Sequence, residues 1–286
     1  MEKGFLIVNP ASGRGNKRKI CSKIIERARE ADLNLEMRVS EYPGHLSVIA
    51  KEAVSSGIES VVILGGDGSL REAGEVLAQT SISIYLIPAG TSNVFARSLK
   101  IPLDPVKATD LFQRGKEVMV DAGEVNGNKF FFMCGSGIDA NVMAGAHLPS
   151  KKIFGRASFY PSVVKEFFTY SFSKIEVDVD GKIAEGTYVA VMNIPHFAGP
   201  YILCPSAQWN DGLLDVIVFS GKRLSFLRHF WKLLLKKPLT RGILHLKGRN
   251  ILIKGSEDIH FQVDGDEKGC LPAKIGVLPG ALRMVV

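Results

Sequence analysis

The stretch VVILGGDGSLREAGEVL, residues 61–77, decides how the first half of the chain folds. The apolar residues 61–64 predict a buried parallel strand, and a glycine-rich turn at 65–69 follows at once. The residues after the turn form one apolar helix face: Leu70, Ala73, Val76 and Leu77. A strand, a glycine turn and a helix together present backbone N–H groups and a helix N-terminus to an anion. The stretch therefore predicts an α/β domain that binds a phosphate group.

Asp67 is unusual in such a turn, because its carboxylate repels a bound phosphate. An acid fits there if it contacts a magnesium-bound water or holds the loop, so it indicates nucleotide chemistry with a metal ion. The turn has neither the G-x-x-x-x-G-K-[ST] nor the G-x-G-x-x-G spacing, so neither of these nucleotide-binding motifs applies. A tight strand-to-helix turn capped by an acid explains the same residues without a ligand.

The first 122 residues alternate apolar strands with amphipathic helices, which predicts a parallel sheet with helices on both faces, a three-layer α/β domain. Strands are expected at residues 5–8, 35–39, 61–64 and 82–87. Three of them run into polar, glycine-containing loops at 9–15, 65–69 and 88–93. Because the carboxyl ends of parallel strands share one edge of the sheet, we expect these loops to converge on one ligand.

The pattern changes after about residue 121, where short strands and turn pairs predict an antiparallel, β-sandwich-like domain. Asn126-Gly127 predicts a hairpin between 117–125 and 129–134, and Asp180-Gly181 one between 174–179 and 188–192. Helical insertions are expected at about 157–169 and 224–235. We thus expect two domains, residues 1–122 and 123–286, joined by a tight junction with a cleft, because no linker separates them.

Composition favours an ordered globular protein that remains in the cytoplasm. Hydrophobic residues make up 46% of the chain, but no apolar window of about 18 residues predicts a transmembrane helix. The N-terminal apolar run is too short for a signal peptide. The four cysteines, Cys21, Cys134, Cys204 and Cys270, form no C-x-x-C pair, so reduced thiols and no zinc site are expected.

The net charge of +7 is unevenly distributed along the chain. Residues 222–256 contain ten Lys or Arg and no Asp or Glu. Such a block indicates a phosphate-rich partner, an anionic membrane or a nucleic acid. No recognised nucleic-acid motif accompanies it, so we do not predict a nucleic-acid partner.

Five motifs in order resemble the diacylglycerol kinase catalytic-domain superfamily, and together they span nearly the whole chain. This superfamily contains bacterial soluble diacylglycerol kinase-like enzymes, ceramide kinases and sphingosine kinases, and is distantly related to NAD kinases. The motifs are Asn9-Pro10-x-Ser12-Gly13, Gly65-Gly66-Asp67-Gly68-Ser69, Pro88-x-Gly90-Thr91-x-Asn93, Asp211-Gly212-Leu213-Leu214-Asp215-Val216 and Val263-Asp264-Gly265-Asp266.

The resemblance implies an ATP site and a Mg²⁺ site. The ATP site would be lined by Asn9, Pro10, Ala11, Ser12, Gly13, Ser40, Gly65, Gly66, Asp67, Gly68, Ser69, Leu70, Arg71, Thr91 and Asn93. Its glycines let the backbone close on phosphates, its hydroxyls donate hydrogen bonds, and Asp67 would act through metal and water. Gln208 and Leu213 (through carbonyls) and Asp211 match a structural Mg²⁺ site, although a plain β-turn also explains Asp211-Gly212.

The resemblance also implies that Asp264-Gly265-Asp266 is catalytic. A lipid hydroxyl loses its proton as it attacks the γ-phosphorus, and a carboxylate within reach can accept that proton. We assign Asp266 as the proton acceptor, with Asp264 positioning it or helping with the metal. The family usually has Glu at the Asp266 position, so the side chain is one methylene shorter here. A hairpin turn is the alternative explanation.

The segment RLSFLRHFWKLLLKK, residues 223–237, predicts a helix with an apolar stripe edged by Lys and Arg. Two interpretations stay open. The helix faces the core with a solvated basic side, lies on an anionic membrane that holds the substrate, or does both.

Together these observations predict a cytoplasmic lipid kinase, with peripheral contact to the inner face of the membrane. The first domain binds MgATP, the second binds the lipid and supplies Asp266, and transfer occurs in the cleft. Diacylglycerol is the best candidate substrate, by resemblance alone. One alternative is an NAD kinase-like activity. The other is a nucleotide- or lipid-binding module without turnover, and the shortened side chain at Asp266 is its only support in the sequence.

Overall fold

A computed structural model describes residues 2–13, 17–145, 169–237 and 242–286, and these group into two compact units. The first unit comprises Met1–Ala122, His196–Pro200 and Pro279–Val286, and the second comprises Gly123–Pro195 and Tyr201–Leu278. The expected contiguous division at residue 122 differs from this grouping. Two later segments join the first unit, and one of them adds a strand to its sheet.

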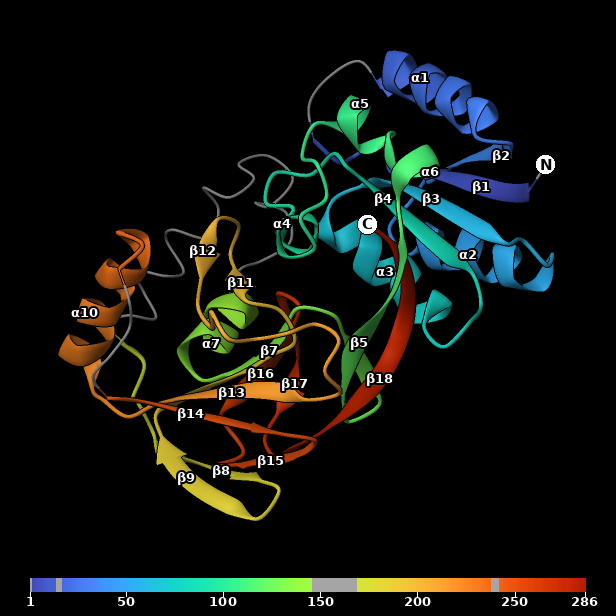
Figure 1. The fold of residues 1–286 in the computed structure, drawn as a ribbon. Coiled ribbons are helices and arrows are strands. Elements are labelled where there is room, and N and C mark those ends of the chain that lie inside the picture. Colours follow the sequence, from blue (N-terminus) through green and yellow to red (C-terminus); the bar gives the residue numbers. More distant parts are fainter. Residues whose placement is uncertain (1, 14–16, 146–168, 238–241) are drawn as a thin grey trace. The chain divides into compact units, whose positions relative to one another are not determined.

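The first unit is built on a parallel sheet (Figure 1), as the sequence predicts. The strands that the chain's first half supplies are β1 (Glu2–Val8), β2 (Leu33–Val39), β3 (Ser60–Gly65) and β4 (Ser83–Pro88), in the order β2-β1-β3-β4. A fifth parallel strand comes from β18 (Ala273–Val285), whose residues Arg283, Met284 and Val285 pair with β4. The buried apolar runs of β1 and β3 place these strands in the centre of the sheet.

Six helices in the described part of the first unit follow from local sequence signals. They are α1 (Lys17–Glu30), α2 (His45–Ser55), α3 (Asp67–Leu77), α4 (Val94–Ser98), α5 (Pro105–Ala108) and α6 (Leu111–Arg114). In α1, Cys21, Ile24 and Ala28 recur at helical spacing and are buried. Asp104 caps α5 by accepting from the N–H groups of Val106 and Lys107, with proline at the first helical position.

The second unit is antiparallel and sandwich-like, as predicted. One sheet has the order β14-β13-β10-β7-β16-β17, and β18-β15-β8-β9 pair in the other. The strands of the first sheet are β7 (Met133–Ser136), β10 (Tyr188–Met192), β13 (Leu214–Phe219), β14 (Ile243–Gly248), β16 (His260–Val263) and β17 (Asp266–Cys270). The remaining elements are β5 (Glu117–Val125), β6 (Asn128–Phe130), α7 (Ile138–Gly145), β8 (Ile175–Val179), β9 (Lys182–Gly186), β11 (His196–Phe197), β12 (Tyr201–Ile202), α10 (Arg223–Leu234) and β15 (Asn250–Lys254). Side chains from both sheets share one apolar core.

Two sequence expectations for this unit differ from the structure, and a third falls on residues that the structure does not describe. The Asp180-Gly181 turn joins β8 to the unpredicted strand β9, not to β10. The strand expected at 129–134 is divided into β6 and β7, because the N–H groups between them bind a side chain described below. The helical insertion expected at 157–169 lies outside the described residues, apart from Thr169, whereas the second insertion is α10.

Candidate functional site

The first two glycine-containing loops are joined by side-chain hydrogen bonds at the carboxyl edge of the parallel sheet. Asn9, which follows β1, donates from Nδ2 to Ser69 Oγ on α3 at 2.9 Å. Ser12 Oγ lies 3.3 Å from the same hydroxyl. Lys17 at the start of α1 donates from Nζ to the carbonyls of Asn9 and Pro10 at 2.5 and 2.7 Å. Lys17 thus adds a cation to this loop, and sequence reasoning did not single it out.

Glycine is required where the third loop meets the other two. A Cβ on Gly13 would lie 1.8 Å from the carbonyl oxygen of Ala89, and one on Gly90 would lie 2.6 Å from Gly66 Cα. No side chain fits at these distances. The loops after β1, β3 and β4 therefore contact one another through backbone atoms, and they converge as the sequence predicts.

We expect Gly13→Ala to destabilise the fold more than Gly57→Ala does. Both glycines have a left-handed φ, +66° and +65°, so both variants carry a strain of about 1–2 kcal/mol. The added methyl group at position 13 also collides with Ala89, whereas nothing lies within 4 Å at position 57. Urea unfolding of both variants measures the difference. Equal losses of unfolding free energy would mean that the first and third loops do not touch in solution.

The N-terminus of α3 is suited to an anion. Gly66 is the N-cap and has no side chain that could cap the first turn of the helix. Gly68 is exposed, and its Cβ position is open. Asp67 Oδ1 accepts from the N–H of Phe95 at 3.1 Å and so ties α3 to α4. This contact supports the loop-holding role of Asp67, while a role through metal and water stays a prediction.

The remaining residues assigned to the ATP site differ in what they offer a ligand. The Asn93 side chain bonds the N–H and carbonyl of Gly90, both at 3.0 Å, so it shapes the third loop. Leu70 is fully buried, and its side chain belongs to the core. Ser40 is also buried, with its hydroxyl 3.5 Å from the carbonyl of Tyr42. The exposed groups are Pro10, Ala11, Gly13, Gly68 and Thr91, and Arg71 on α3 is partly exposed.

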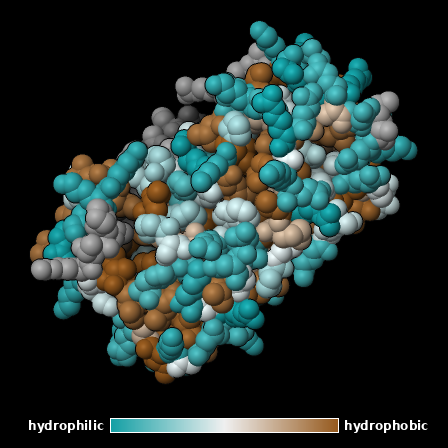
Figure 2. All heavy atoms as spheres, viewed as in Figure 1, coloured by the Kyte–Doolittle hydropathy of each residue, from teal (hydrophilic) through white to brown (hydrophobic). Residues whose placement is uncertain are grey.

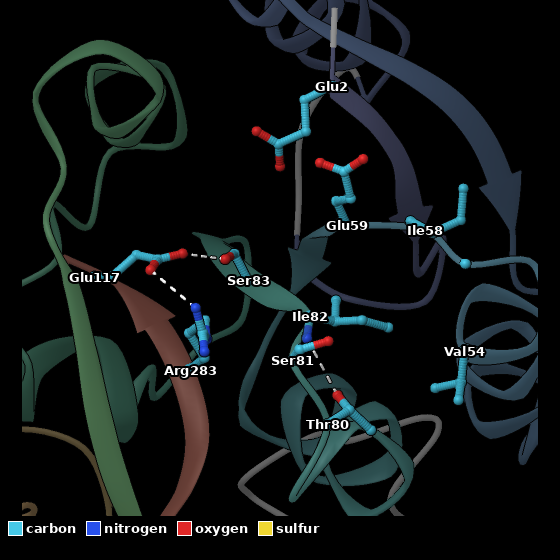
Figure 3. Close-up of a pocket in the computed structure, with 11 residues that line it drawn as sticks. Glu2, Val54, Ile58, Glu59, Thr80, Ser81, Ile82, Ser83, Glu117 and Arg283 are labelled. Carbon is cyan, nitrogen blue, oxygen red and sulfur yellow. Dashed lines mark hydrogen bonds and ion pairs between the residues drawn. The ribbon is translucent and has the colours of Figure 1, made fainter.

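A cavity of about 410 Å³ in the first unit is not this site. Figure 3 shows that Ser83 and Arg283 both point toward Glu117, and Arg283 Nη1 lies 3.3 Å from Glu117 Oε2. The lining residues Glu2 and Ser83 begin β1 and β4, so the cavity lies at the amino edge of the sheet. A six-residue strand, about 20 Å long, separates that edge from the glycine loops.

In the second unit, the Asp264 carboxylate is bound by three backbone N–H groups. Oδ2 accepts from Phe131 at 2.8 Å, and Oδ1 accepts from Phe132 and Met133, both at 2.9 Å. This carboxylate is the reason that β6 and β7 are separate strands. The geometry favours the positioning role for Asp264 over a role in binding metal, because its acceptor sites already have donors.

Asp266 is held next to that anchor. It is the partly exposed first residue of β17 and pairs with Val263. The intervening Gly265 donates from its N–H to Gln262 Oε1 at 2.7 Å, and Gln262 Nε2 donates to Asp139 Oδ2 at 3.1 Å. Sequence reasoning missed Gln262 and Asp139, because the pairing of β7 with β16 and the position of α7 bring them together.

Asp139 should make folding less favourable as pH rises. Burial raises the pKa of its carboxyl from 3.8 to about 6, although hydrogen bonds from Gln262, Ala140 and Tyr188 oppose the rise. The folded chain therefore keeps this proton to higher pH than the unfolded chain, so stability falls between about pH 4 and pH 6. The shift corresponds to about 3 kcal/mol.

Asp139→Asn should remove this pH dependence, because asparagine does not titrate. The free energy of unfolding of the variant, relative to that of wild type, should rise by about 3 kcal/mol between about pH 4 and pH 7. Urea unfolding across this range is the measurement, with Asp178→Asn on β8 as a surface control. The same pH dependence in variant and wild type would show that the Asp139 carboxyl group is solvated.

Asp211, one of the expected magnesium ligands, is paired with a lysine. Lys247 Nζ lies 2.5 Å from Asp211 Oδ2, and Asp211 Oδ1 accepts from the N–H of Leu213 at 3.1 Å. Partial burial lowers the pKa of Lys247, but the Asp211 hydrogen bond and the charges of Asp215 and Asp211 raise it overall. The ammonium group supplies the positive charge that Mg²⁺ would bring. Lys247 thus competes with a metal ion for Asp211, and the Mg²⁺ site at Gln208, Asp211 and Leu213 stays a prediction.

Cys204, Asp215 and His245 come together although their spacing in the sequence gives no metal signal. His245 Nε2 lies 2.6 Å from Asp215 Oδ1, and Cys204 Sγ lies 3.7 Å from that oxygen. Two ligands of one tetrahedral zinc would be about 3.3 Å apart, so the shorter contact is a hydrogen bond. Lys247 Nζ lies 3.3 Å from the other oxygen of the buried Asp215, so its ammonium group offsets the charge of this carboxylate.

Both units match known protein families. The family model "Diacylglycerol kinase catalytic domain" matches residues 3–125. The model "YegS C-terminal NAD kinase beta sandwich-like domain" matches residues 133–286. The first match covers all three glycine loops, and the second covers the turn from Asp264 to Asp266.

Similar proteins align over nearly the whole chain. A diacylglycerol kinase of Bacillus subtilis is 26% identical over 96% of this chain and 93% of its own length. A "Probable lipid kinase YegS-like" of Pseudomonas aeruginosa is 34% identical over 90% of this chain and 86% of its own length. A solved structure of a candidate diacylglycerol kinase from Bacillus anthracis is 25% identical and superposes with a TM-score of 0.84, over 99% of this chain and 94% of that one. The chain therefore belongs to the diacylglycerol kinase family of lipid kinases, which includes the YegS-like proteins.

Proposed function

We propose that the protein transfers the γ-phosphoryl group of ATP to the primary hydroxyl of a membrane lipid, with diacylglycerol as substrate and phosphatidate as product. The observation that carries the proposal is the convergence of three glycine-containing loops at the N-terminus of α3, where the N-cap is a glycine. Relatives named diacylglycerol kinase and lipid kinase support the choice of acceptor.

The nucleotide phosphates are assigned to the α3 N-terminus and the exposed backbone around it. Gly68 allows close approach, and the Thr91 hydroxyl can donate a hydrogen bond. The hydrogen bonds among Asn9, Ser12 and Ser69 hold the first loop against α3. Mg²⁺, when bound with ATP, would neutralise charge on the phosphate oxygens.

Asp266 is assigned as the acceptor of the lipid hydroxyl proton. It is the partly exposed acid of the turn, whereas the carboxylate of Asp264 is occupied by backbone donors. Asp264 and Gln262 fix the backbone next to Gly265, so the Asp266 side chain extends from a fixed backbone position. A fixed base near the hydroxyl lowers the cost of orienting it during transfer.

The test is transfer of label from γ-labelled MgATP into a lipid extract, followed by separation of organic and aqueous phases. Label in phosphatidate, increased by added diacylglycerol, would support the full proposal. Label in another lipid would retain the kinase and replace the substrate. Label only in the aqueous phase with NAD present would favour the NAD kinase-like alternative. Nucleotide binding without transfer to any acceptor would favour a module without turnover.

A further inference from the structure

Helix α10 packs on the second unit through only a narrow stripe. Its Phe226 ring lies 5.9 Å from Phe172 and 5.9 Å from Phe219. His229, three residues later, is the buried residue of the helix and lies 5.0 Å from the ring of Phe219. The packed stripe therefore follows Phe226 and His229. The core-facing interpretation of the helix accounts for this side alone.

The opposite side of α10 exposes large apolar side chains. Leu224 is 82% exposed, Trp231 55% and Leu235 61%. Spacings of seven and four residues place these three on one helix face. Ile202 of β12, a strand that contacts α10, is 46% exposed. Figure 2 shows hydrophobic residues at the surface beside hydrophilic ones on the side where Figure 1 places α10. A surface of this kind marks an interaction site.

Basic groups flank this apolar face. Arg228, Lys232, Lys236 and Lys237 are on α10 or directly after it, and none forms an ion pair within the described part of the chain. No acid occurs between residues 222 and 256. An apolar face with Trp and Leu, flanked by Lys and Arg, is typical of helices that lie in the interface of an anionic bilayer.

We propose that α10 docks the protein on an anionic bilayer, with Leu224, Trp231 and Leu235 in the interface and the lysines against lipid headgroups. This proposal assigns a membrane-binding surface to the protein. It rests on the proposed function in one respect: a lipid substrate in the bilayer would give the docking its purpose. Charge distinguishes this occupant from a second copy of the chain, because two α10 helices would bring like charges together.

The test is flotation of the full chain, without nucleotide, on vesicles of phosphatidylcholine alone or with equal phosphatidylglycerol. Wild type should float only with the anionic vesicles. Lys232→Glu, Lys236→Glu and Lys237→Glu together should weaken binding by at least about 100-fold, about one kcal/mol for each lysine that is lost. Trp231→Ser with Leu235→Ser should also abolish flotation. Ile183→Ser, a change at a 66% exposed residue of β9 in the same unit, should have no effect.

A second readout reports insertion of Trp231. In a Trp209→Phe background, the fluorescence of Trp231 should shift to the blue when anionic vesicles are added. Equal flotation of wild type and both α10 variants, or no shift of Trp231, would overturn the proposal. A dimer that Trp231→Ser dissociates, without vesicle binding, would assign the face to a second copy instead. Because flotation needs no ATP, a failed kinase assay leaves this result intact.

Discussion

Asp266→Asn is expected to reduce phosphoryl transfer to lipid by roughly 10²- to 10⁴-fold, the range that a positioned general base contributes. Asparagine keeps the size of the side chain and its place at the start of β17, but it cannot accept a proton at neutral pH. The lipid hydroxyl would then attack without a base. The initial rate of label transfer into the organic phase measures the effect, and nucleotide binding should be unchanged.

Two matched variants locate this effect at Asp266. Asp266→Glu lengthens the side chain by one methylene and keeps the carboxylate, so it should keep activity within about tenfold. Glu267→Gln changes the exposed neighbour, whose partner is His260, and should leave activity unchanged. If Asp266→Asn retained full activity, the proton would have another acceptor. The assignment of Asp266 would then be wrong while the kinase itself could stand.

Asp264→Ala is expected to lower the free energy of unfolding on the order of 4 kcal/mol, because buried N–H groups lose a charged acceptor. The three donors belong to Phe131, Phe132 and Met133, and all three residues are buried. Asp264 also has a left-handed φ of 50°, which alanine adopts less readily than aspartate. Urea unfolding measures the loss.

The neighbouring acid provides the control for this prediction. Asp266→Ala removes a partly exposed carboxylate two residues away, so its cost should be below about 1 kcal/mol. Asp264→Asn keeps one carbonyl oxygen and tolerates the left-handed φ, so its loss should be intermediate. Equal stability of the Asp264→Ala and Asp266→Ala variants would contradict the anchoring role.

Local signals predicted much of the first unit and one hairpin turn of the second. The glycines at 13, 66 and 90 are needed at backbone contacts, and the position of the loops at the carboxyl ends of parallel strands indicated that they meet. Asn126-Gly127 likewise specified its hairpin, with φ values of 47° and 83°. In each case the residues that determine the structure are close in the sequence or at the ends of neighbouring parallel strands.

Contacts set by strand register were beyond such reasoning. Lys247 reaches Asp215 because β14 pairs antiparallel with β13, and nothing in the local sequence predicts that pairing. The same holds for Gln262, which meets Asp139 across 123 residues. Asp264 illustrates a different limit, since its motif indicated importance but could not distinguish chemistry from backbone anchoring. The exposed face of α10 was ambiguous because an amphipathic pattern does not state how wide the packed stripe is.

The placement of β18 has a consequence for synthesis on the ribosome. The parallel sheet of the first unit gains its β4 neighbour only when Arg283, Met284 and Val285 have been made, long after β4 itself. Until then β4 is an open edge strand, and such edges pair with other chains. The β4 edge of the nascent first unit thus stays unpaired until the second unit has been translated. The two units are therefore not expected to fold independently. If the second unit were exchanged between relatives, its β18 would have to match the β4 of the first unit.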